Sequence, residues 1–125
     1  MPRKPNTELR RQQIVDGLLR TIAAQGYTGA TIQAIASASG LAPGLVHYHF
    51  RDKREILVTL VEQLGAYAAS RFQARAAVAA NARERLRAYI DARLAYGSDA
   101  NPDAVAAWVM IGAEAVREPD VREIY

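Results

Sequence analysis

The amino-acid sequence predicts an all-α fold, in which an N-terminal three-helix bundle is joined by a long fourth helix to a further group of helices. Half of the residues are apolar and alanine is the most frequent of them, which favours helices because alanine loses no side-chain entropy in one. Apolar residues recur three and four positions apart along most of the chain, which is the spacing of one helix face. Capping residues, glycines and prolines stand where these stripes begin and end.

The first predicted helix runs from Thr7 to Gln25, and Gly26 is expected to end it in the left-handed conformation. Its inner face consists of Ile14, Val15, Leu18, Leu19, Ile22 and Ala23. Thr31 is expected to cap the second helix by accepting a hydrogen bond from an unpaired backbone N–H, and Gly40 is expected to end that helix. The inner face of the second helix consists of Ile32, Ile35 and Ala36.

A third, short helix is predicted from Pro43 to His49, because proline suits the first position of a helix. A turn at Leu41 and Ala42 separates it from the second helix. Two short helices joined by such a turn, with a glycine in it, form a helix-turn-helix motif.

The fourth helix is predicted to begin at D-K-R-E, residues 52–55, which has the pattern of a capping box. No proline interrupts it before about Ala79, so it could extend about 40 Å at a rise of about 1.5 Å per residue. Its apolar stripe consists of Ile56, Leu57, Leu60, Val61, Leu64, Ala68 and Phe72.

Asparagines are expected to cap the next two helices. Asn81 begins a fifth helix that ends near Gly97, and Asn101 precedes Pro102 at the start of a sixth helix. The predicted inner faces are Leu86, Tyr89, Ile90 and Leu94 in the fifth helix, and Val105, Trp108, Val109, Ile111 and Gly112 in the sixth.

Pro119 ends the sixth helix, and together with Asp120 it has the pattern of the start of a seventh. A new apolar stripe follows at Val121, Ile124 and Tyr125, where the chain stops. We therefore expect a chain that is truncated after the sixth helix.

Positive charge is concentrated in the first part of the chain. Residues 1–54 hold eight Lys and Arg against three Asp and Glu, a net charge of +5, whereas residues 55–125 hold eight against ten, a net charge of −2. A basic segment attached to a mildly acidic one suggests a polyanionic partner such as nucleic acid. Ordinary solvated helix faces can produce the same asymmetry, so charge alone leaves both interpretations open.

Several other classes of protein do not fit the sequence. The absence of cysteine excludes disulfides and thiolate metal sites. Neither a signal peptide nor a run of about 20 apolar residues is present, so we expect a cytoplasmic protein without a membrane span. His47 and His49 are two positions apart and point to different helix faces, so we expect no metal, and no cofactor. No nucleophile, base and acid set is present, and no enzyme is expected.

The segment TIQAIASASGLAPGLVHYHFRDKREIL, residues 31–57, combines a capping threonine, a glycine at the turn, a second glycine early in the next helix, an aromatic-rich stretch and a lysine. These are Thr31, Gly40, Gly44, Tyr48-His49-Phe50 and Lys53. In this register, residues 8–64 resemble the tetracycline-repressor (TetR) family of bacterial transcriptional regulators. Residues in AVAAWVMIGAEAVREPDV are similar to the choline-responsive branch of that family.

The resemblance implies a helix-turn-helix DNA-binding domain at residues 1–52 and a partial helical regulatory and ligand-binding domain at residues 53–125. It further implies a sequence-specific repressor that acts as a homodimer and that a small-molecule inducer releases from a double-stranded DNA operator. Ala42 stands where the family often has Ser or Thr, and His47 stands where it commonly has Tyr. Since both positions normally touch phosphate, the alternative is a helical interaction module whose helix-turn-helix no longer binds DNA specifically.

The expected DNA contacts lie in the N-terminal arm, in the helix-turn-helix and at the start of the long helix. They are Arg3, Lys4, Thr31, Gln33, Ala42, Pro43, Gly44, Leu45, His47, Tyr48, His49 and Lys53. The first residues of the recognition helix, 42–45, cannot form a bidentate contact with a base. Apolar contacts with thymine methyl groups and readout of DNA shape are therefore expected, while phosphate contacts supply most of the affinity.

In the TetR family the helices beyond the DNA-binding domain enclose a cavity for a small molecule. The residues of this chain that could line it are Tyr67, Arg71, Phe72, Tyr89, Arg93, Trp108, Met110 and Glu114. At helical spacing, the same residues could equally belong to the core.

Overall fold

The computed structural model describes residues 5–94 and 97–125, and all regular secondary structure in that part of the chain is helical. The helices are α1 (Pro5–Gln25), α2 (Ile32–Ser39), α3 (Pro43–His49), α4 (Lys53–Ala76), α5 (Ala82–Arg93), α6 (Pro102–Arg117) and α7 (Pro119–Ile124). The predicted all-α fold is thus confirmed. None of these helices is long and apolar enough to cross a membrane.

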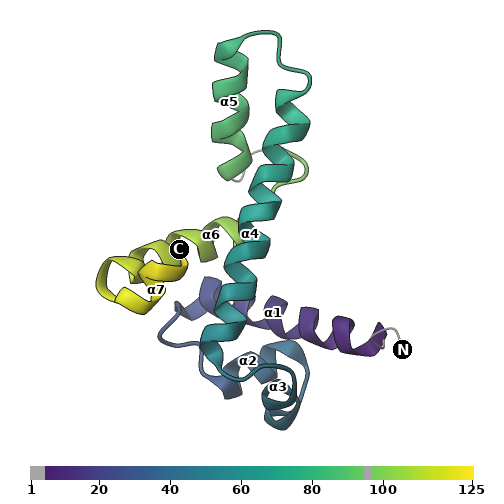
Figure 1. Cartoon of the computed structure of the whole chain (residues 1–125), viewed down its shortest axis with the longest axis vertical. Helices are drawn as coiled ribbons and strands as arrows, with labels where there is room; N and C mark the ends of the chain where they lie inside the picture. Colours follow the sequence, from purple (N-terminus) through teal and green to yellow (C-terminus); the bar gives the residue numbers. More distant parts are fainter. Residues whose placement is uncertain (1–4, 95–96) are drawn as a thin grey trace.

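Helix α4 forms the long axis of the molecule, and the other helices are arranged along it (Figure 1). The N-terminal bundle, α1 to α3, packs around the beginning of α4. Helix α5 runs beside the end of α4, and α6 with α7 lies against its middle (Figure 1). Helix α6 also packs on α1, so it connects the N-terminal bundle to the middle of α4.

Side-chain caps begin the helices where the sequence predicts them. Thr31 Oγ1 accepts a hydrogen bond from the Ala34 N–H at 3.1 Å, and Asn81 Oδ1 accepts one from the Glu84 N–H at 2.9 Å. At the other end of α2, Gly40 has a φ of 70°, a left-handed conformation that favours glycine. These contacts satisfy backbone groups that a helix end would otherwise leave unpaired.

The start of α4 departs slightly from the predicted capping box. Asp52 Oδ1 accepts from the Glu55 N–H at 2.9 Å, as expected. Glu55 Oε2, however, accepts from the N–H of Arg51, one residue before the capping position, also at 2.9 Å. The helix continues for 24 residues, which corresponds to about 36 Å at about 1.5 Å per residue.

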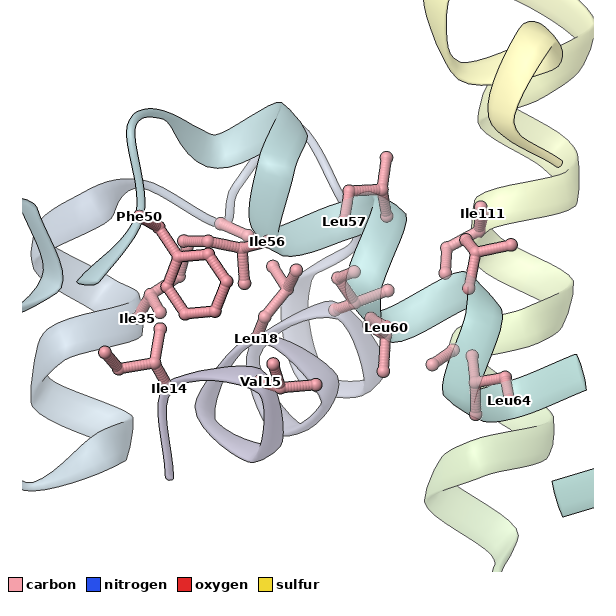
Figure 2. Packing of buried hydrophobic residues seen from close by; sticks show 14 of the residues in the cluster. Ile14, Val15, Leu18, Ile35, Phe50, Ile56, Leu57, Leu60, Leu64 and Ile111 are labelled. Atoms are coloured by element: carbon pink, nitrogen blue, oxygen red, sulfur yellow. The ribbon is translucent and has the colours of Figure 1, made fainter. Parts of the chain in front are cut away.

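One hydrophobic core extends through both halves of the molecule. Within the N-terminal bundle, Leu18 and Phe50 lie among the fully buried side chains. Along α4, Leu60 and Leu64 continue this core toward Ile111 of α6 (Figure 2). The DNA-binding part implied by the resemblance therefore shares its core with the rest of the chain, and the boundary at residue 52 remains a prediction.

The predicted inner faces of α5 and α6 are partly wrong. On α5, Leu86 is 61 % exposed and Ile90 is 46 % exposed, whereas the buried residues are Ala88 and Ala92. Small side chains let α5 lie close to α4, so its large apolar residues point outward. Helix α6 likewise buries Ala104, Ala107, Ile111 and Ala115, while Val109 is exposed.

Candidate nucleic-acid interface and ligand cavity

Helix α3 has one buried face and one exposed face. Val46 and Phe50, four residues apart, anchor it in the core. The other face is solvent-exposed and holds six of the predicted DNA contacts, Ala42, Pro43, Gly44, Leu45, His47 and Tyr48. These six predicted DNA contacts therefore lie together on the solvent-exposed surface of α3.

Arg11 of α1 fixes the end of α3. Its guanidinium lies 4.1 Å above the ring of Phe50 and donates a hydrogen bond to the backbone carbonyl of His49. A cation over an aromatic face is attracted to the π-electrons of the ring. Since Arg11 satisfies a carbonyl that the helix end leaves unpaired, the orientation of α3 relative to α1 is well defined.

Lys53, a predicted phosphate contact, is bound within the molecule. Its Nζ donates to the backbone carbonyl of Tyr27 at 2.5 Å and lies 3.8 Å from the centre of the Tyr27 ring. Burial lowers the pKa of the ammonium below its usual value, and Glu114 partly offsets that shift. An ammonium has three donors, so a phosphate contact by Lys53 remains a prediction.

The remaining predicted DNA contacts are placed differently. Thr31 and Gln33 are both exposed at the start of α2. His49 is half-buried, and its ring meets that of Tyr48 edge-on, with 4.9 Å between the centres. Arg3 and Lys4 lie outside the described residues.

Replacing Ala42 with serine is expected to stabilise the protein by about 1 kcal/mol, because Ala42 occupies the N-cap of α3 without a side chain that can cap it. Its extended backbone, with φ −71° and ψ 146°, suits a capping serine. Urea unfolding measures the change. Ala66→Ser on the exposed side of α4 is the control and is expected to destabilise slightly. Equal effects of both substitutions would contradict the capping explanation.

A cavity of about 120 Å³ lies between α4, α5 and α6. Three of the predicted ligand contacts, Tyr67, Arg93 and Trp108, line it. The other lining residues are Leu64, Gly65, Ala68, Ala92, Ala104 and Val105. Two aromatic side chains and a predominantly apolar wall suit a small organic ligand.

Arg71, also predicted to contact a ligand, is buried and belongs to an ion-pair network whose other members are partly exposed. We refer to Arg71, Arg75 and Asp99 as the Arg71 cluster. The Arg71 guanidinium is 4 % exposed and binds the Asp99 carboxylate through Nε at 3.1 Å. It also donates to the carbonyls of Ala92 at 3.0 Å and Leu94 at 3.1 Å. The cluster therefore joins α4 to the end of α5 and to the loop that follows.

Asp99 receives hydrogen bonds from both arginines of the Arg71 cluster. Arg75 Nη2 lies 2.6 Å from Asp99 Oδ1, and these bonds, first from Arg75 and then from Arg71, hold the pKa of the carboxyl well below its usual range. The carboxylate consequently stays ionised as a counter-charge for Arg71.

The other four predicted ligand contacts do not line the cavity. Phe72 of α4 and Tyr89 of α5 pack edge-on against each other, with 5.9 Å between their ring centres. Met110 is exposed, and Glu114 lies near Thr28 at the N-terminal bundle. The prediction selected large and polar residues, whereas small residues such as Gly65, Ala68 and Ala92 create the space. The recurrence of such small residues at helical spacing is the sequence signal from which the cavity could have been predicted.

Comparison with known proteins finds a family model that matches the N-terminal part of the chain. Residues 14–60, which include the helix-turn-helix and the start of α4, match the family model described as bacterial regulatory proteins, tetR family. This part of the chain therefore matches the TetR family.

Among curated proteins it is similar to the HTH-type transcriptional regulator BetI of Rhizobium meliloti, with 34 % identity over 99 % of this chain and 61 % of the relative. BetI of Paraburkholderia phymatum is 30 % identical over 99 % of this chain and 63 % of its own length. The chain thus spans about three fifths of the length of these relatives. Both relatives are named as transcriptional regulators and not as enzymes.

Solved structures of similar fold include two transcriptional regulators. One, from Saccharomonospora viridis and in complex with choline, has a TM-score of 0.78 at 30 % identity over 94 % of this chain and 61 % of that one. The other, from Rhodococcus sp., has a TM-score of 0.73 at 26 % identity with the same coverage.

Proposed function

We propose that this chain is a DNA-binding transcriptional regulator that acts as a repressor and is released from its operator by a small-molecule ligand. The observation that carries the proposal is the exposed face of α3, which lies within a TetR-type helix-turn-helix. The net charge of +5 on residues 1–54 supports it, because DNA attracts a basic domain. As part of the same proposal, residues 1–52 form the DNA-binding domain and residues 53–125 form part of the regulatory and ligand-binding domain.

Binding to the duplex upstream of the chain's own gene and to a random duplex, measured across a salt series, tests the DNA-binding function. A preference of about 10³ or more for the upstream duplex, with a steep loss of affinity in salt, is the expected result. Equal weak binding to both duplexes would instead support the interaction module.

The cavity between α4, α5 and α6 is the proposed ligand site. Trp108 and Tyr67 offer aromatic faces, which attract quaternary ammonium groups. The Saccharomonospora viridis regulator was solved with choline, so choline is the first ligand to test. Asp99 offsets only part of the adjacent positive charge, because Arg71 and Arg75 share it and Arg93 also lines the cavity. The aromatic faces must therefore hold a cationic ligand against this charge.

Trp108→Ala is expected to weaken choline binding by at least about tenfold, since it removes an aromatic face that would contact the cation. Titration calorimetry measures the affinity. Val109→Ala is the matched control, because Val109 is the next residue of α6 and is 62 % exposed away from the cavity. A similar loss in both variants, or none in Trp108→Ala, would count against this site.

Repression is expected to require two copies of the protein. In a symmetric dimer, two recognition helices would enter successive major grooves about 34 Å apart. A ligand that shifts this separation would lower operator affinity. The stoichiometry of the DNA complex, measured by sedimentation with and without choline, tests this part of the proposal.

A further inference from the structure

The exposed face of α3 is organised around a position without a side chain. With about 100° between successive residues of a helix, positions 44 and 48 lie opposite the buried Val46, and position 45 lies beside them. Tyr48 is 79 % exposed and Leu45 is 40 % exposed. Gly44 therefore stands at the centre of the outward face, next to two large apolar side chains.

The fold does not require glycine at position 44. A Cβ built there would meet no atom within 4 Å, and Gly44 is not among the described glycines with a positive φ. Glycine is one of the least favourable residues within a helix. The chain itself gives no steric reason for glycine at position 44. The bare backbone there suits a partner molecule that approaches the helix closely.

The side chains around Gly44 determine which partner fits. Ala42, Pro43 and Leu45 are exposed and apolar, and none can form a bidentate hydrogen bond with a base edge. The distinctive apolar group in the major groove of DNA is the 5-methyl group of thymine. The basic charge of residues 1–54 complements the phosphates on either side of the groove.

We propose that the outer face of α3 recognises thymine by its methyl group, with Gly44 as the point of closest approach to the DNA. The methyl group packs against Leu45, and the bare backbone at Gly44 lets the helix descend far enough for this contact. The proposal rests on the DNA-binding function proposed above and specifies its sequence preference.

The first test uses duplexes selected by the full chain from a random-core library. In the selected duplex, uracil replaces thymine one position at a time, which removes only the methyl group. We expect at least one such replacement to lower affinity about fourfold, the effect of losing one buried methyl group. Unchanged affinity at every position would overturn the proposal but leave DNA binding intact. Failure to select any duplex would overturn both.

The second test couples the methyl group to its proposed contact. In Leu45→Ala, the thymine and uracil duplexes should bind with affinities that agree within about twofold, because the partner of the methyl group is gone. A preference for thymine that persists in a folded Leu45→Ala variant would overturn the assignment.

The third test addresses the close approach. Gly44→Ala is expected to keep or raise the melting temperature and to lower affinity for the selected duplex by about tenfold or more. Ala66→Ser is the control, because Ala66 is also helical and exposed but lies on α4 and not on α3. It should leave DNA affinity unchanged. Full affinity in Gly44→Ala would overturn the proposed approach.

Discussion

Gly17→Ala is expected to lower the free energy of unfolding by at least about 2 kcal/mol, even though alanine favours helices more than glycine does. Gly17 is buried where α1 crosses α2. A Cβ there would lie 2.1 Å from Ser39 Oγ and 2.9 Å from the backbone carbonyl oxygen of Ile35. Both approaches are too close, so the helices would have to separate. Urea unfolding measures the loss.

Two further variants distinguish the steric overlap at Gly17 from a general effect of alanine on helix stability. Gly65→Ala should stabilise by up to about 1 kcal/mol, because nothing opposes its Cβ. Adding Ser39→Gly to Gly17→Ala should recover part of the loss, since it removes the Ser39 side chain but not the Ile35 carbonyl. A stable Gly17→Ala variant would show that α1 and α2 can move apart without cost.

Arg71→Lys is expected to lower the free energy of unfolding by about 2–3 kcal/mol, although it preserves the charge. The buried guanidinium serves the Asp99 carboxylate and two backbone carbonyls, and a single ammonium cannot reach them all in the same geometry. Backbone amides of α5 should exchange with solvent faster, because the Arg71 cluster attaches the end of that helix to α4.

Arg87→Lys is the control for this change, because Arg87 lies on α5 with its side chain 83 % exposed. Surface substitutions of this kind are expected to alter stability by less than about 0.5 kcal/mol. If α5 exchanged at the same rate in Arg71→Lys and in the unsubstituted chain, the Arg71 cluster would not be what attaches it.

The Arg71 cluster should also resist mild acid. The pKa of Asp99 is depressed in the folded protein, so its contribution is complete above the unfolded pKa, near 3.9. That contribution is lost only as the pH falls through the lower folded pKa. Protection of α5 amides, corrected for intrinsic exchange rates, should therefore be the same at pH 7 and pH 5. Loss of protection already at pH 5 would contradict this assignment.

Features that depend on neighbouring residues in the sequence could be predicted well. Thr31, Asn81 and Asn101 cap their helices because a capping side chain reaches an amide only two or three positions away. Helix α3 was predicted at its observed bounds, Pro43–His49, because a proline suits the first position of a helix.

Features that depend on packing between helices could not be predicted in the same way. The helical spacing of large apolar residues suggested that Leu86 and Ile90 face inward, but α5 buries Ala88 and Ala92 instead. The cavity is likewise lined largely by small residues from three helices. Arg71 looked like a ligand contact because its partner Asp99 lies 28 positions away, beyond the reach of any local pattern.

The continuous core described above limits how this protein can be recombined with its relatives. Leu60 and Leu64 of α4 contribute to the same cluster as Val15 of α1 and Ile111 of α6 (Figure 2). A chimera joined at residue 52 would pair helix surfaces that did not evolve together. A junction placed beyond Leu64, with the α1-facing side of α6 transferred as well, would keep both sides of the contact from one parent.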